Sequence, residues 1–403
     1  MFAWVFVRVF ARVPPSTRTT VKIAIVHEWL TTLGGSELVL REMLRLFPGA
    51  SVFTLIDKMT ADDRAFVGVG KVSTSFLDAI PGVGARYRSL LPLYPAAIRS
   101  LDLGAFDVVI SSSHSVAKNV RTRDGQLHVT YCHSPMRYAW DLRDQYLREA
   151  GLSTGVRGVM ARTLLDSLQR WDRARSADVD VFTTNSRYVA DRIQRAYGRS
   201  STVIYPPVDV DFFTPGPRDE SLGEYYATVS RFVPYKRVDL IARAFAQLPD
   251  RKLVIVGDGP DAEKVRAATG ANVVMLGRAS RERVRTVLRG AKAFLFGAEE
   301  DFGIAPVEAQ ACGAPVIAFG RGGALETVNA SDDATRTGIF FSEQTPESIA
   351  AAVREFEGSA PISHDACRAN AERFSEARFR REFRSLVDRE YDRFRAGESP
   401  ERS

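Results

Sequence analysis

The chain has 403 residues, of which 45% are hydrophobic and 26% charged, and its formal net charge is +6. This composition is typical of a globular protein long enough for two domains, and it argues against disordered and integral membrane classes. The positive charge favours anionic partners such as phosphates, nucleotides or acidic membrane surfaces, but the basic residues are widely spread and no nucleic-acid-binding module is present, so nucleic acid is not expected as a partner.

The chain has three cysteines, Cys132, Cys312 and Cys367. They are too few and too scattered for a disulfide framework or a zinc site. Their distribution favours a reducing cytoplasm.

The first twenty residues are interpreted as an extension that precedes the fold. Residues 1–13 are apolar apart from Arg8 and Arg12, and this run is far shorter than the roughly 20 residues that a spanning helix needs. A charged region ahead of the apolar run and a small-residue cleavage site are both lacking, so a signal peptide is not expected. We expect residues 1–20 to be disordered or to result from a start codon read too far upstream, with an interfacial membrane anchor as the alternative.

The first domain is predicted at residues 21–205 as an alternation of strands and helices. Short apolar runs predict strands at 21–26, 51–56, 106–111, 127–132, 179–184 and 201–204. Residues 27–33 are interpreted as a loop, and helices are predicted at 34–47, 156–174 and 186–197. Alternation of this kind is typical of a parallel sheet with helices on both faces.

A Pro/Gly-rich linker is predicted at residues 206–218, and the α/β pattern then restarts in a second domain at 219–375. Its strands are predicted at 225–229, 252–256, 272–276, 293–296, 315–319 and 338–341, and its helices at 237–247, 260–268, 281–290 and 346–356. The charged stretch from about 366 to 394 is predicted to be helical throughout. Residues 376–403 are expected to form a C-terminal helix that crosses back to the first domain, and a tail.

Three glycine-containing turns precede predicted helices. They are Gly34-Gly35, Gly257-Asp258-Gly259-Pro260 and Asp301-Phe302-Gly303. Each would present backbone N–H groups and the positive end of a helix to an anion. One such turn is routine in α/β folds, whereas three on two facing sheets fit a diphosphate held in a cleft.

The turn that begins at Gly257 also fits the Gly-x-Gly-x-x-Ala fingerprint of dinucleotide-binding proteins. A Rossmann site needs an acidic residue at the end of the next strand to bind the ribose. Here the strand 272–276 ends in Gly277-Arg278, and the nearest carboxylate, Glu282, lies on the following helix. An NAD-dependent oxidoreductase is therefore kept as a disfavoured alternative.

Two loops of the second domain carry charges suited to a nucleotide-sugar. Arg231 and Lys236 follow the first strand of that domain, where two cations would stabilise the charge of a departing diphosphate, although a solvated basic loop is an equal alternative. The stretch 299–318 begins with an acidic cluster directly after a strand and continues into a short helix. Glu300 and Glu308 lie on either side of this turn, which predicts a site for the sugar and ribose at the carboxyl edge of a parallel sheet.

Three of the five histidines, His27, His114 and His133, fall at or just beyond predicted strand ends of the first domain. Their clustering at one edge predicts that at least one of them functions in the site. No metal is expected, because the chain has neither a His-x-x-x-His pattern nor a carboxylate at ligand spacing. The Asp-x-Asp sequences at 178–180 and 209–211 flank a buried strand and lie in the linker, so they are interpreted as caps and turns.

These motifs together resemble a known family. Arg231 and Lys236, the turn at 257–260, and the stretch from Glu300 to Glu308 followed by Gly-Ala-Pro-Val-Ile-Ala at 313–318 are similar to retaining glycosyltransferases of family four. The resemblance covers residues 21 to 394 and implies the α/β GT-B fold, with two facing Rossmann-like domains, parallel sheets and a cleft between them. The segment 131–141, Tyr-Cys-His-Ser-Pro-Met-Arg-Tyr-Ala-Trp-Asp, resembles mannosyltransferases of bacterial O-antigen and exopolysaccharide assembly.

The resemblance implies a retaining, metal-independent hexosyltransferase that needs no cofactor besides its nucleotide-sugar donor. In particular, it implies transfer of mannose from GDP-mannose to a glycan or lipid-linked acceptor in the synthesis of cell-surface polysaccharide, including lipopolysaccharide. A catalytically inactive nucleotide-sugar-binding protein is the second alternative. The implied catalytic residues are His133, Glu300, Arg231 and Lys236. The implied donor-binding residues are Gly34, Gly35, Arg231, Lys236, Gly257, Gly259, Arg278, Glu300, Phe302, Gly303, Ile304 and Glu308, and the implied acceptor-binding residues are His27, His114 and Arg137.

The same resemblance assigns roles within this set. Glu308 would bind the ribose hydroxyls and Glu300 the transferred hexose. Arg231 and Lys236 would hold the diphosphate, and His133 would contact the hexose near the reacting carbon.

A peripheral contact with the inner face of an anionic membrane is expected from the stretch 80–101. This stretch combines Arg86, Arg88 and Arg99 with several leucines and a tyrosine, a composition that suits a lipid-linked acceptor at a membrane surface. A packed helix of the first domain is the alternative.

Overall fold

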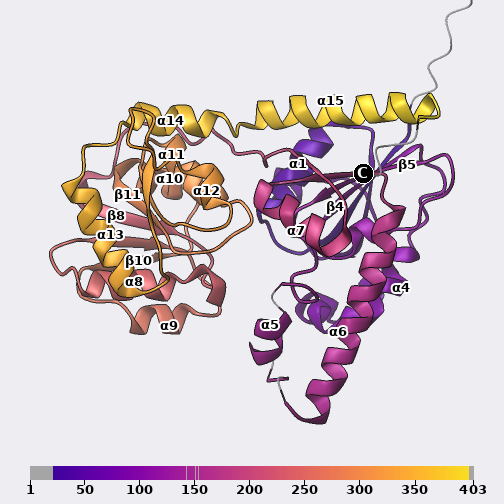
Figure 1. Cartoon of the computed structure of the whole chain (residues 1–403), viewed down its shortest axis with the longest axis horizontal. Helices are drawn as coiled ribbons and strands as arrows, with labels where there is room; N and C mark the ends of the chain where they lie inside the picture. Colours follow the sequence, from indigo (N-terminus) through magenta and orange to yellow (C-terminus); the bar gives the residue numbers. More distant parts are fainter. Residues whose placement is uncertain (1–20, 142, 150, 153, 399–403) are drawn as a thin grey trace, which may run out of the picture.

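The computed structural model describes residues 21–141, 143–149, 151–152 and 154–398, and it has two α/β domains that face each other (Figure 1). The predictions for residues 1–20 lie outside the described residues. The predicted fold class, two facing Rossmann-like domains with parallel sheets, is confirmed.

The first domain contains a parallel sheet of seven strands in the order β3-β2-β1-β4-β5-β6-β7. Its strands are β1 (Ile23–Leu30), β2 (Ser51–Asp57), β3 (Val72–Thr74), β4 (Val108–Ser113), β5 (Leu127–Cys132), β6 (Val181–Thr184) and β7 (Thr202–Val203). The central strands β4 and β5 are buried along their whole length, as expected for a sheet covered on both faces. The strand order reverses direction between β1 and β4, and in such sheets a ligand crevice forms at the carboxyl ends of the two strands where this happens.

The second domain repeats this design with six parallel strands in the order β10-β9-β8-β11-β12-β13. Its strands are β8 (Tyr225–Val229), β9 (Leu253–Val256), β10 (Val273–Gly277), β11 (Ala291–Phe296), β12 (Val316–Phe319) and β13 (Gly338–Phe341). Here the order reverses between β8 and β11, so the loops that follow these two strands lie at the second crevice.

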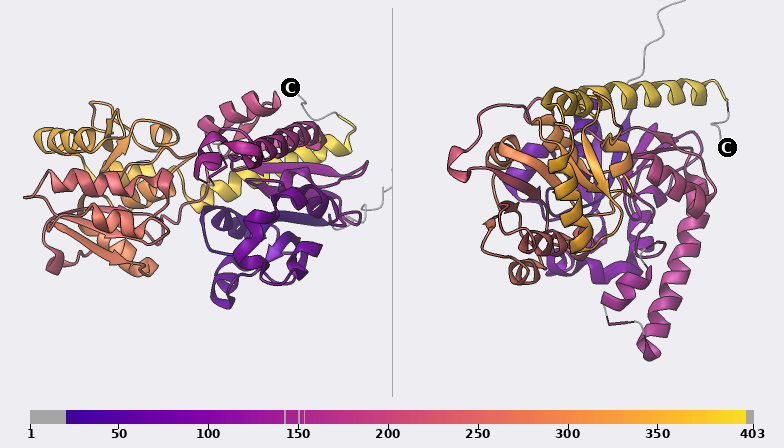
Figure 2. Two further views of the ribbon diagram at one scale, coloured as in Figure 1. Left: turned by 90° about the horizontal axis from the view of Figure 1, so that it is seen from below. Right: turned by 60° about the vertical axis from the view of Figure 1, so that its left-hand side comes forward.

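Helices cover both faces of each sheet, as the two views of Figure 2 show. Those of the first domain are α1 (Gly35–Leu46), α2 (Ala61–Val67), α3 (Val83–Arg86), α4 (Tyr94–Arg99), α5 (Arg143–Glu149), α6 (Gly155–Arg175) and α7 (Arg187–Tyr197). Those that follow are α8 (Val238–Ala246), α9 (Ala262–Ala267), α10 (Arg281–Gly290), α11 (Ile304–Ala311), α12 (Ala324–Thr327), α13 (Pro346–Gly358), α14 (His364–Glu372) and α15 (Glu376–Arg395). Within the described residues, none of the helices combines the length and the apolar character that crossing a bilayer requires.

The C-terminal part of the chain is not one continuous helix, and that prediction is wrong. It divides into α14 and α15 around Phe374, which is fully buried in the core of the second domain. Ser375 then begins the new helix, because its hydroxyl accepts a hydrogen bond from the backbone N–H of Arg378. Beyond this break, α15 lies along the first domain, where Phe379 and Phe383 are buried in the core (Figure 1).

The first strand is longer than predicted. β1 continues in parallel register with β2 as far as the pair Leu30–Asp57, so the interpretation of residues 27–30 as loop is wrong. The polar residues His27 and Glu28 therefore lie inside a strand and are fully buried. Sequence polarity marked them as loop, but buried hydrogen-bond partners described below compensate for their burial.

Candidate active site between the two domains

The carboxyl ends of both sheets meet at the interface between the domains. On the second domain, the loop that follows β8 carries Lys236 and the loop that follows β11 carries Glu300, and their side chains form an ion pair. Both side chains are mostly buried, at 20% and 16% exposure. The two residues predicted to bind the diphosphate and the hexose are thus brought together, whereas the side chain of Arg231 at the start of the same loop is exposed.

The residue that follows Glu300 joins the two domains. Asp301 is buried, and its carboxylate pairs with Arg137 of the loop after β5 and, at 2.6 Å, with Arg192 of α7. The guanidinium of Arg137 also lies over the ring of Tyr235, 5.7 Å from its centroid. Burial works to raise the pKa of Asp301, but the two arginines outweigh it and hold the pKa below its usual value. Arg137, expected to bind the acceptor, is therefore placed in an interdomain ion pair.

Two further contacts reinforce this interface. The hydroxyl of Tyr188 donates to Glu299 over 2.9 Å. Glu326 of the second domain accepts hydrogen bonds from the backbone N–H groups of Arg187 and Tyr188, at 2.9 and 3.0 Å. A carboxylate at the N-terminus of a helix satisfies free N–H groups and the helix dipole, so Glu326 binds α7 across the domain boundary.

The predicted glycine turns at Gly35 and Gly303 also meet at the interface. A Cβ on Gly35 would lie 3.0 Å from the Cδ1 of Ile304, which brings the start of α1 against the start of α11. Gly303 has a φ of 88°, a left-handed conformation that favours glycine. Gly34 precedes α1, and a Cβ there would lie 3.1 Å from Glu37.

Phe302, between these groups, is buried and packs with Tyr205 and Phe374, at centroid distances of 5.8 and 5.3 Å. Its side chain thus belongs to the core, so only its backbone is available for the predicted contact with a donor. Gly323, which the sequence analysis did not single out, donates its N–H to the carbonyl of Glu300 over 2.8 Å. A Cβ on Gly323 would lie 2.3 Å from the Cα of Phe302, so only glycine fits; the Gly-Arg-Gly-Gly turn directly after a strand was the available signal.

The glycine turn at 257–260 is explained by packing. A Cβ on Gly257 would lie 1.8 Å from the carbonyl oxygen of Ser230, and one on Gly259 would lie 2.4 Å from that of Phe232. The glycines allow the turn after β9 to pack on the loop after β8, which also carries Lys236. Arg278 is exposed beyond β10. This close packing removes the main support for the NAD-dependent alternative, which is not favoured.

Glu308 lies on α11, in a partly buried position. Burial raises the pKa of its carboxyl to about 7, an effect that Arg281 opposes and Asp209 reinforces. Arg281 is itself paired with Asp209 at 2.8 Å, so its charge is largely compensated there. Glu308 is consequently a carboxyl group whose charge is costly in the absence of a ligand.

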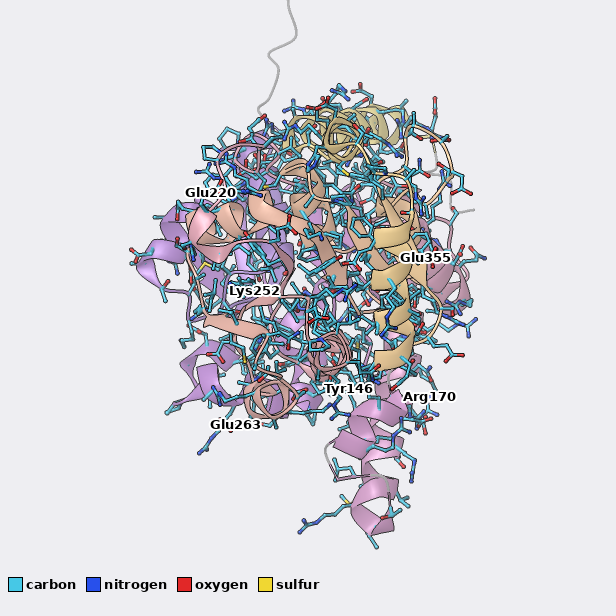
Figure 3. The ribbon with its side chains drawn as sticks, turned by 90° about the vertical axis from the view of Figure 1, so that its left-hand side faces the viewer. Tyr146, Arg170, Glu220, Lys252, Glu263 and Glu355 are labelled. Atoms are coloured by element: carbon cyan, nitrogen blue, oxygen red, sulfur yellow. The ribbon has the colours of Figure 1, made fainter. Side chains whose placement is uncertain are left out.

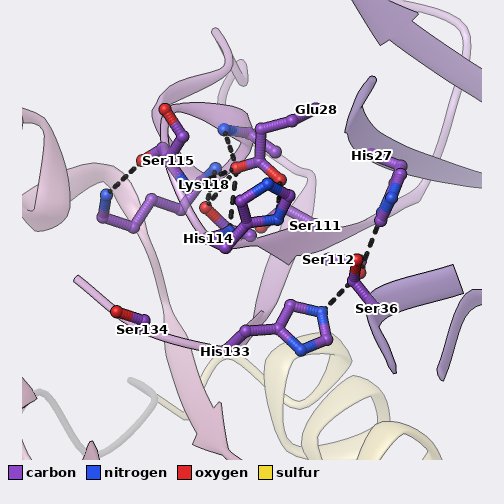
Figure 4. Close-up of polar contacts among 12 residues, drawn as sticks. His27, Glu28, Ser36, Ser111, Ser112, His114, Ser115, Lys118, His133 and Ser134 are labelled. Atoms are coloured by element: carbon purple, nitrogen blue, oxygen red, sulfur yellow. Dashed lines mark hydrogen bonds and ion pairs between the residues drawn. The ribbon is translucent and has the colours of Figure 1, made fainter. Parts of the chain in front are cut away.

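The three histidines predicted to cluster do so at the reversal between β1 and β4 (Figure 4). The ring centroids of His27 and His133 lie 6.1 and 6.3 Å from that of His114. His27 is fully buried, whereas His133 is partly exposed at the end of β5. Burial, reinforced by the neighbouring His114, lowers the pKa of His133 to about 3, so this ring is neutral.

Glu28, which the sequence analysis did not identify, stabilises the other side of the cluster. One carboxylate oxygen accepts four hydrogen bonds, from the hydroxyl of Ser113 and from the backbone N–H groups of His114, Ser115 and Ala117, at 2.8 to 3.0 Å. The second oxygen lies 3.1 Å from the Nδ1 of His114. Although burial opposes it, the Glu28 carboxylate raises the pKa of His114, and His114 in turn helps to hold the pKa of Glu28 low. Within the described residues, no three His, Cys, Asp or Glu side chains are grouped so as to hold a metal ion.

The apolar side chains of the stretch 80–101 mostly face the protein interior. Tyr94 is buried, and Leu90 and Leu91 pack against the first-domain core, while Leu93 is 42% exposed. The side chain of Arg88 lies outside the described residues. A packed segment, the alternative considered for this stretch, describes most of these contacts.

The most exposed large apolar side chains of the described residues lie elsewhere, on the first two turns of α6. Val156, Val159 and Met160 are 78%, 61% and 68% exposed. With α5, this helix projects from the first domain, and Tyr146 and Arg170 mark the two helices in Figure 3. The two acidic residues of α6 are both engaged, Asp166 with Arg143 at 2.6 Å and Asp172 with Lys118 at 2.5 Å.

Comparisons with known proteins agree with this architecture. Residues 219–374 match the family model described as "Glycosyl transferases group 1", and residues 33–212 match "Glycosyltransferase Family 4". A GDP-mannose-dependent monoacylated alpha-(1-6)-phosphatidylinositol monomannoside mannosyltransferase of Corynebacterium glutamicum is 38% identical over 179 residues, which cover 38% of this chain and 47% of that protein. The chain thus spans about half the length of this curated relative.

Solved structures with the same fold match nearly the whole chain. HepE of Anabaena in complex with UDP has a TM-score of 0.66 at 18% identity, covering 91% of this chain and all of HepE. Sucrose-phosphate synthase of Thermosynechococcus elongatus has a TM-score of 0.69 at 17% identity, covering 92% and 99% of the two chains. At these identities the likeness concerns the fold.

Proposed function

Because the chain belongs to the family-four glycosyltransferases of the GT-B fold, we propose that it transfers a hexose, specifically mannose from GDP-mannose, to a glycan or lipid-linked acceptor. The observation that carries this proposal is the juxtaposition of Lys236 and Glu300 at the strand reversal of the second sheet, beside the loop that presents His133 and Arg137 from the first. A cation and a carboxylate, both mostly buried at such an edge, suit the two ends of a sugar diphosphate. The C. glutamicum relative is GDP-mannose-dependent by name, and HepE binds UDP, so GDP-mannose is the donor to test first against uridine donors.

The proposed reaction retains the configuration at the sugar carbon and uses no metal. The bond between that carbon and the diphosphate breaks, and the acceptor oxygen bonds to the carbon from the same face. The acceptor's hydroxyl proton passes to the departing phosphate oxygen, so no protein nucleophile is required. Lys236 and Arg231 would stabilise the departing diphosphate, Glu300 would hold the hexose, and Glu308 would accept hydrogen bonds from the ribose.

The donor assignment is tested by a thermal-shift panel of GDP-mannose, UDP-glucose, UDP-N-acetylglucosamine and NAD. We expect GDP-mannose to raise the melting temperature most, because a ligand that binds only the folded state adds stability that increases with the ratio of its concentration to its Kd. Stabilisation by NAD alone would overturn the proposal.

Activity is then measured with Lys236→Ala and Glu300→Ala. Both should lose transfer by at least about a hundredfold, as expected when a group that stabilises transition-state charge is removed. Glu343→Ala, an exposed position of the same domain, is the matched control. Near-normal turnover of Glu300→Ala would refute the site assignment. Donor binding without turnover in the unaltered protein would favour the alternative of a catalytically inactive nucleotide-sugar-binding protein.

We propose that contact with an anionic membrane, which a lipid-linked acceptor requires, is made by the first two turns of α6. Three exposed apolar side chains beside exposed Arg157 suit insertion at a charged interface, and the acidic residues of this helix are neutralised internally. Flotation with vesicles containing phosphatidylglycerol should recover the chain, and changing Val156, Val159 and Met160 to serine should abolish recovery. Leu93→Ser is the matched control, and binding that is unchanged in the triple variant would refute this location.

A further inference from the structure

A continuous series of hydrogen bonds leads from Glu37 of α1 to His133, and Figure 4 shows its part from His27 through Ser112 to His133. The Nε2 of His27 lies 3.2 Å from Oε1 of Glu37, and the Nδ1 of His27 lies 3.1 Å from the hydroxyl of Ser112. The same hydroxyl lies 2.9 Å from the Nε2 of His133. Glu37, His27 and Ser112 are all buried, and within the described part of the chain no protein group hydrogen-bonds the Nδ1 of His133.

The donor and acceptor roles along this series are linked. The pKa of Glu37 is lowered, since the hydrogen bond with His27 and the surrounding electrostatics outweigh the effect of burial, so Glu37 is an ionised acceptor and His27 must donate from Nε2. A serine hydroxyl has one proton, which Ser112 donates either to His27 or to His133. Whichever histidine does not receive it must itself donate to the Ser112 oxygen.

Two arrangements therefore exist. If His27 is neutral, its Nδ1 accepts the Ser112 proton, and His133 donates from Nε2 and keeps a lone pair on Nδ1. If His27 is an imidazolium, Ser112 donates to His133, whose Nδ1 then carries the proton. The second arrangement requires a further buried cation 6.1 Å from His114, whose pKa the Glu28 carboxylate raises, whereas the first requires none.

The surroundings of His133 support a single neutral form. Tyr131 lies 5.0 Å from the His133 ring and is buried, with its hydroxyl donating to the carbonyl of Ile204 at 2.8 Å, so it does not compete for the imidazole. The ring of His114 lies 6.3 Å from that of His133. A neutral imidazole has one N–H, and the bond made by one nitrogen determines what the other offers to a ligand.

We propose that Glu37, His27 and Ser112 are positioning residues that fix His133 in the Nε2–H tautomer, so that its Nδ1 presents a lone pair to a hydroxyl of the donor sugar. The identity of the ligand rests on the proposed function. The tautomer itself is a property of the chain and can be measured without any ligand.

The tautomer is tested by long-range ¹H–¹⁵N NMR of the full chain labelled at histidine. Only five histidines are present, so single His→Gln variants assign the signals. We expect His133 to be Nε2–H, to lose this uniform state in Ser112→Ala, and to keep it in Ser112→Thr, which retains the hydroxyl. An Nδ1–H His133, or a His133 signal that Ser112→Ala leaves unchanged, would overturn the proposal.

The adjacent serine provides a matched control. The hydroxyl of Ser111 lies on the same strand and bonds the Nε2 of His128 at 2.9 Å, away from the proposed series. Ser111→Ala should leave the His133 signals and the transfer rate unchanged. If Ser112→Ala fails to fold, His27→Gln interrupts the series of hydrogen bonds one step earlier. His133 should then also lose its uniform Nε2–H state.

Kinetics separate a positioning role from a general loss of structure. Ser112→Ala should lower kcat roughly tenfold, the value of one hydrogen bond to the sugar, while the Kd of GDP, which lacks the sugar, stays the same. Equal loss of GDP affinity would indicate a structural role and refute the proposal. If no nucleotide-sugar binds the unaltered protein, the proposed function fails. The tautomer measurement still decides whether Glu37, His27 and Ser112 position His133.

Discussion

Glu308 offers a test in which stability and ligand binding respond in opposite directions. Burial raises the pKa of this carboxyl from its ordinary 4.5 to about 7. Each unit corresponds to about 1.4 kcal/mol, so the difference of 7 minus 4.5 makes full ionisation of the group cost about 3.5 kcal/mol of folding stability. Glu308→Gln removes this ionisation while keeping the size of the side chain.

The sign of the effect follows from the raised pKa. The folded state binds the proton of Glu308 more tightly than the unfolded state does. The contribution of the protonated carboxyl to folding stability is therefore complete below about pH 4.5 and is lost as the pH rises through about 7. The Glu308→Gln variant has no carboxyl to ionise at this position, so it does not lose this stability as the pH rises. Relative to the unaltered chain, the variant should gain about 3 kcal/mol between pH 4.5 and pH 7.5, which corresponds to roughly 6–12 °C in melting temperature for a domain of this size.

Differential scanning fluorimetry across this pH range measures the difference in melting temperature between the variant and the unaltered protein, which is called the gap below. Glu263→Gln, whose side chain is 91% exposed on α9 of the same domain, controls for the loss of one negative charge and should show a constant gap. A gap for Glu308→Gln that stays flat or narrows as the pH rises would refute the reasoning.

Calorimetry then connects this carboxyl to the ligand. If ribose hydroxyls bind the carboxylate, GDP-mannose binding at pH 7 should release a fraction of a proton, visible as a heat that depends on the buffer's ionisation enthalpy. Glu308→Gln should bind more weakly and release none from this site. Donor binding to the unaltered chain without proton release would contradict the assigned role, even if the stability result holds.

Two further changes test the interface and the backbone beside the site. Asp301→Asn leaves Arg137 and Arg192 without their shared counter-ion, which should cost about 3 kcal/mol of folding stability. The melting temperature should fall, and the radius of gyration measured by small-angle scattering should increase. Unchanged scattering and melting would contradict the interdomain role of Asp301. Arg237, directly after Lys236, has a φ of 56°, so Arg237→Gly should be more stable than Arg237→Ala by about 1 kcal/mol, and the reverse order in chemical unfolding would refute the strain.

The alternation of apolar runs and helical segments predicted every strand of both sheets except the three-residue edge strand β3, because parallel strands buried on two faces are continuous apolar runs. The same pattern led to the wrong prediction of a loop at residues 27–30, because His27 and Glu28 interrupt the apolar run although they remain in β1. Apart from the contact of His27 with Glu37, ten positions away, their side-chain hydrogen bonds come from residues 85 or more positions away, such as Ser112 and Ser113. Local polarity carries no information about partners so distant in the sequence.

Side-chain pairing set the limit for the site as well. The strand-end positions of Lys236 and Glu300 were predictable, because loops after the strands at a reversal must lie at one edge. The role of Asp301 was not, since its partner Arg137 is 164 positions away and belongs to the other domain. Nor did any pattern in the sequence indicate that Glu326 binds the start of α7.

The acidic loop after β11 combines domain contact with the proposed sugar site. Glu299 binds Tyr188 and Asp301 binds two arginines of the first domain, so the residues on both sides of Glu300 are attached across the interface. The carbonyl of Glu300 is held in addition by the N–H of Gly323. Backbone freedom at Glu300 is therefore smallest while the domains remain in contact. It follows that Asp301→Asn should reduce transfer through the placement of the Glu300 carboxylate, and that a fall in kcat larger than the fall in donor affinity is the form this loss should take.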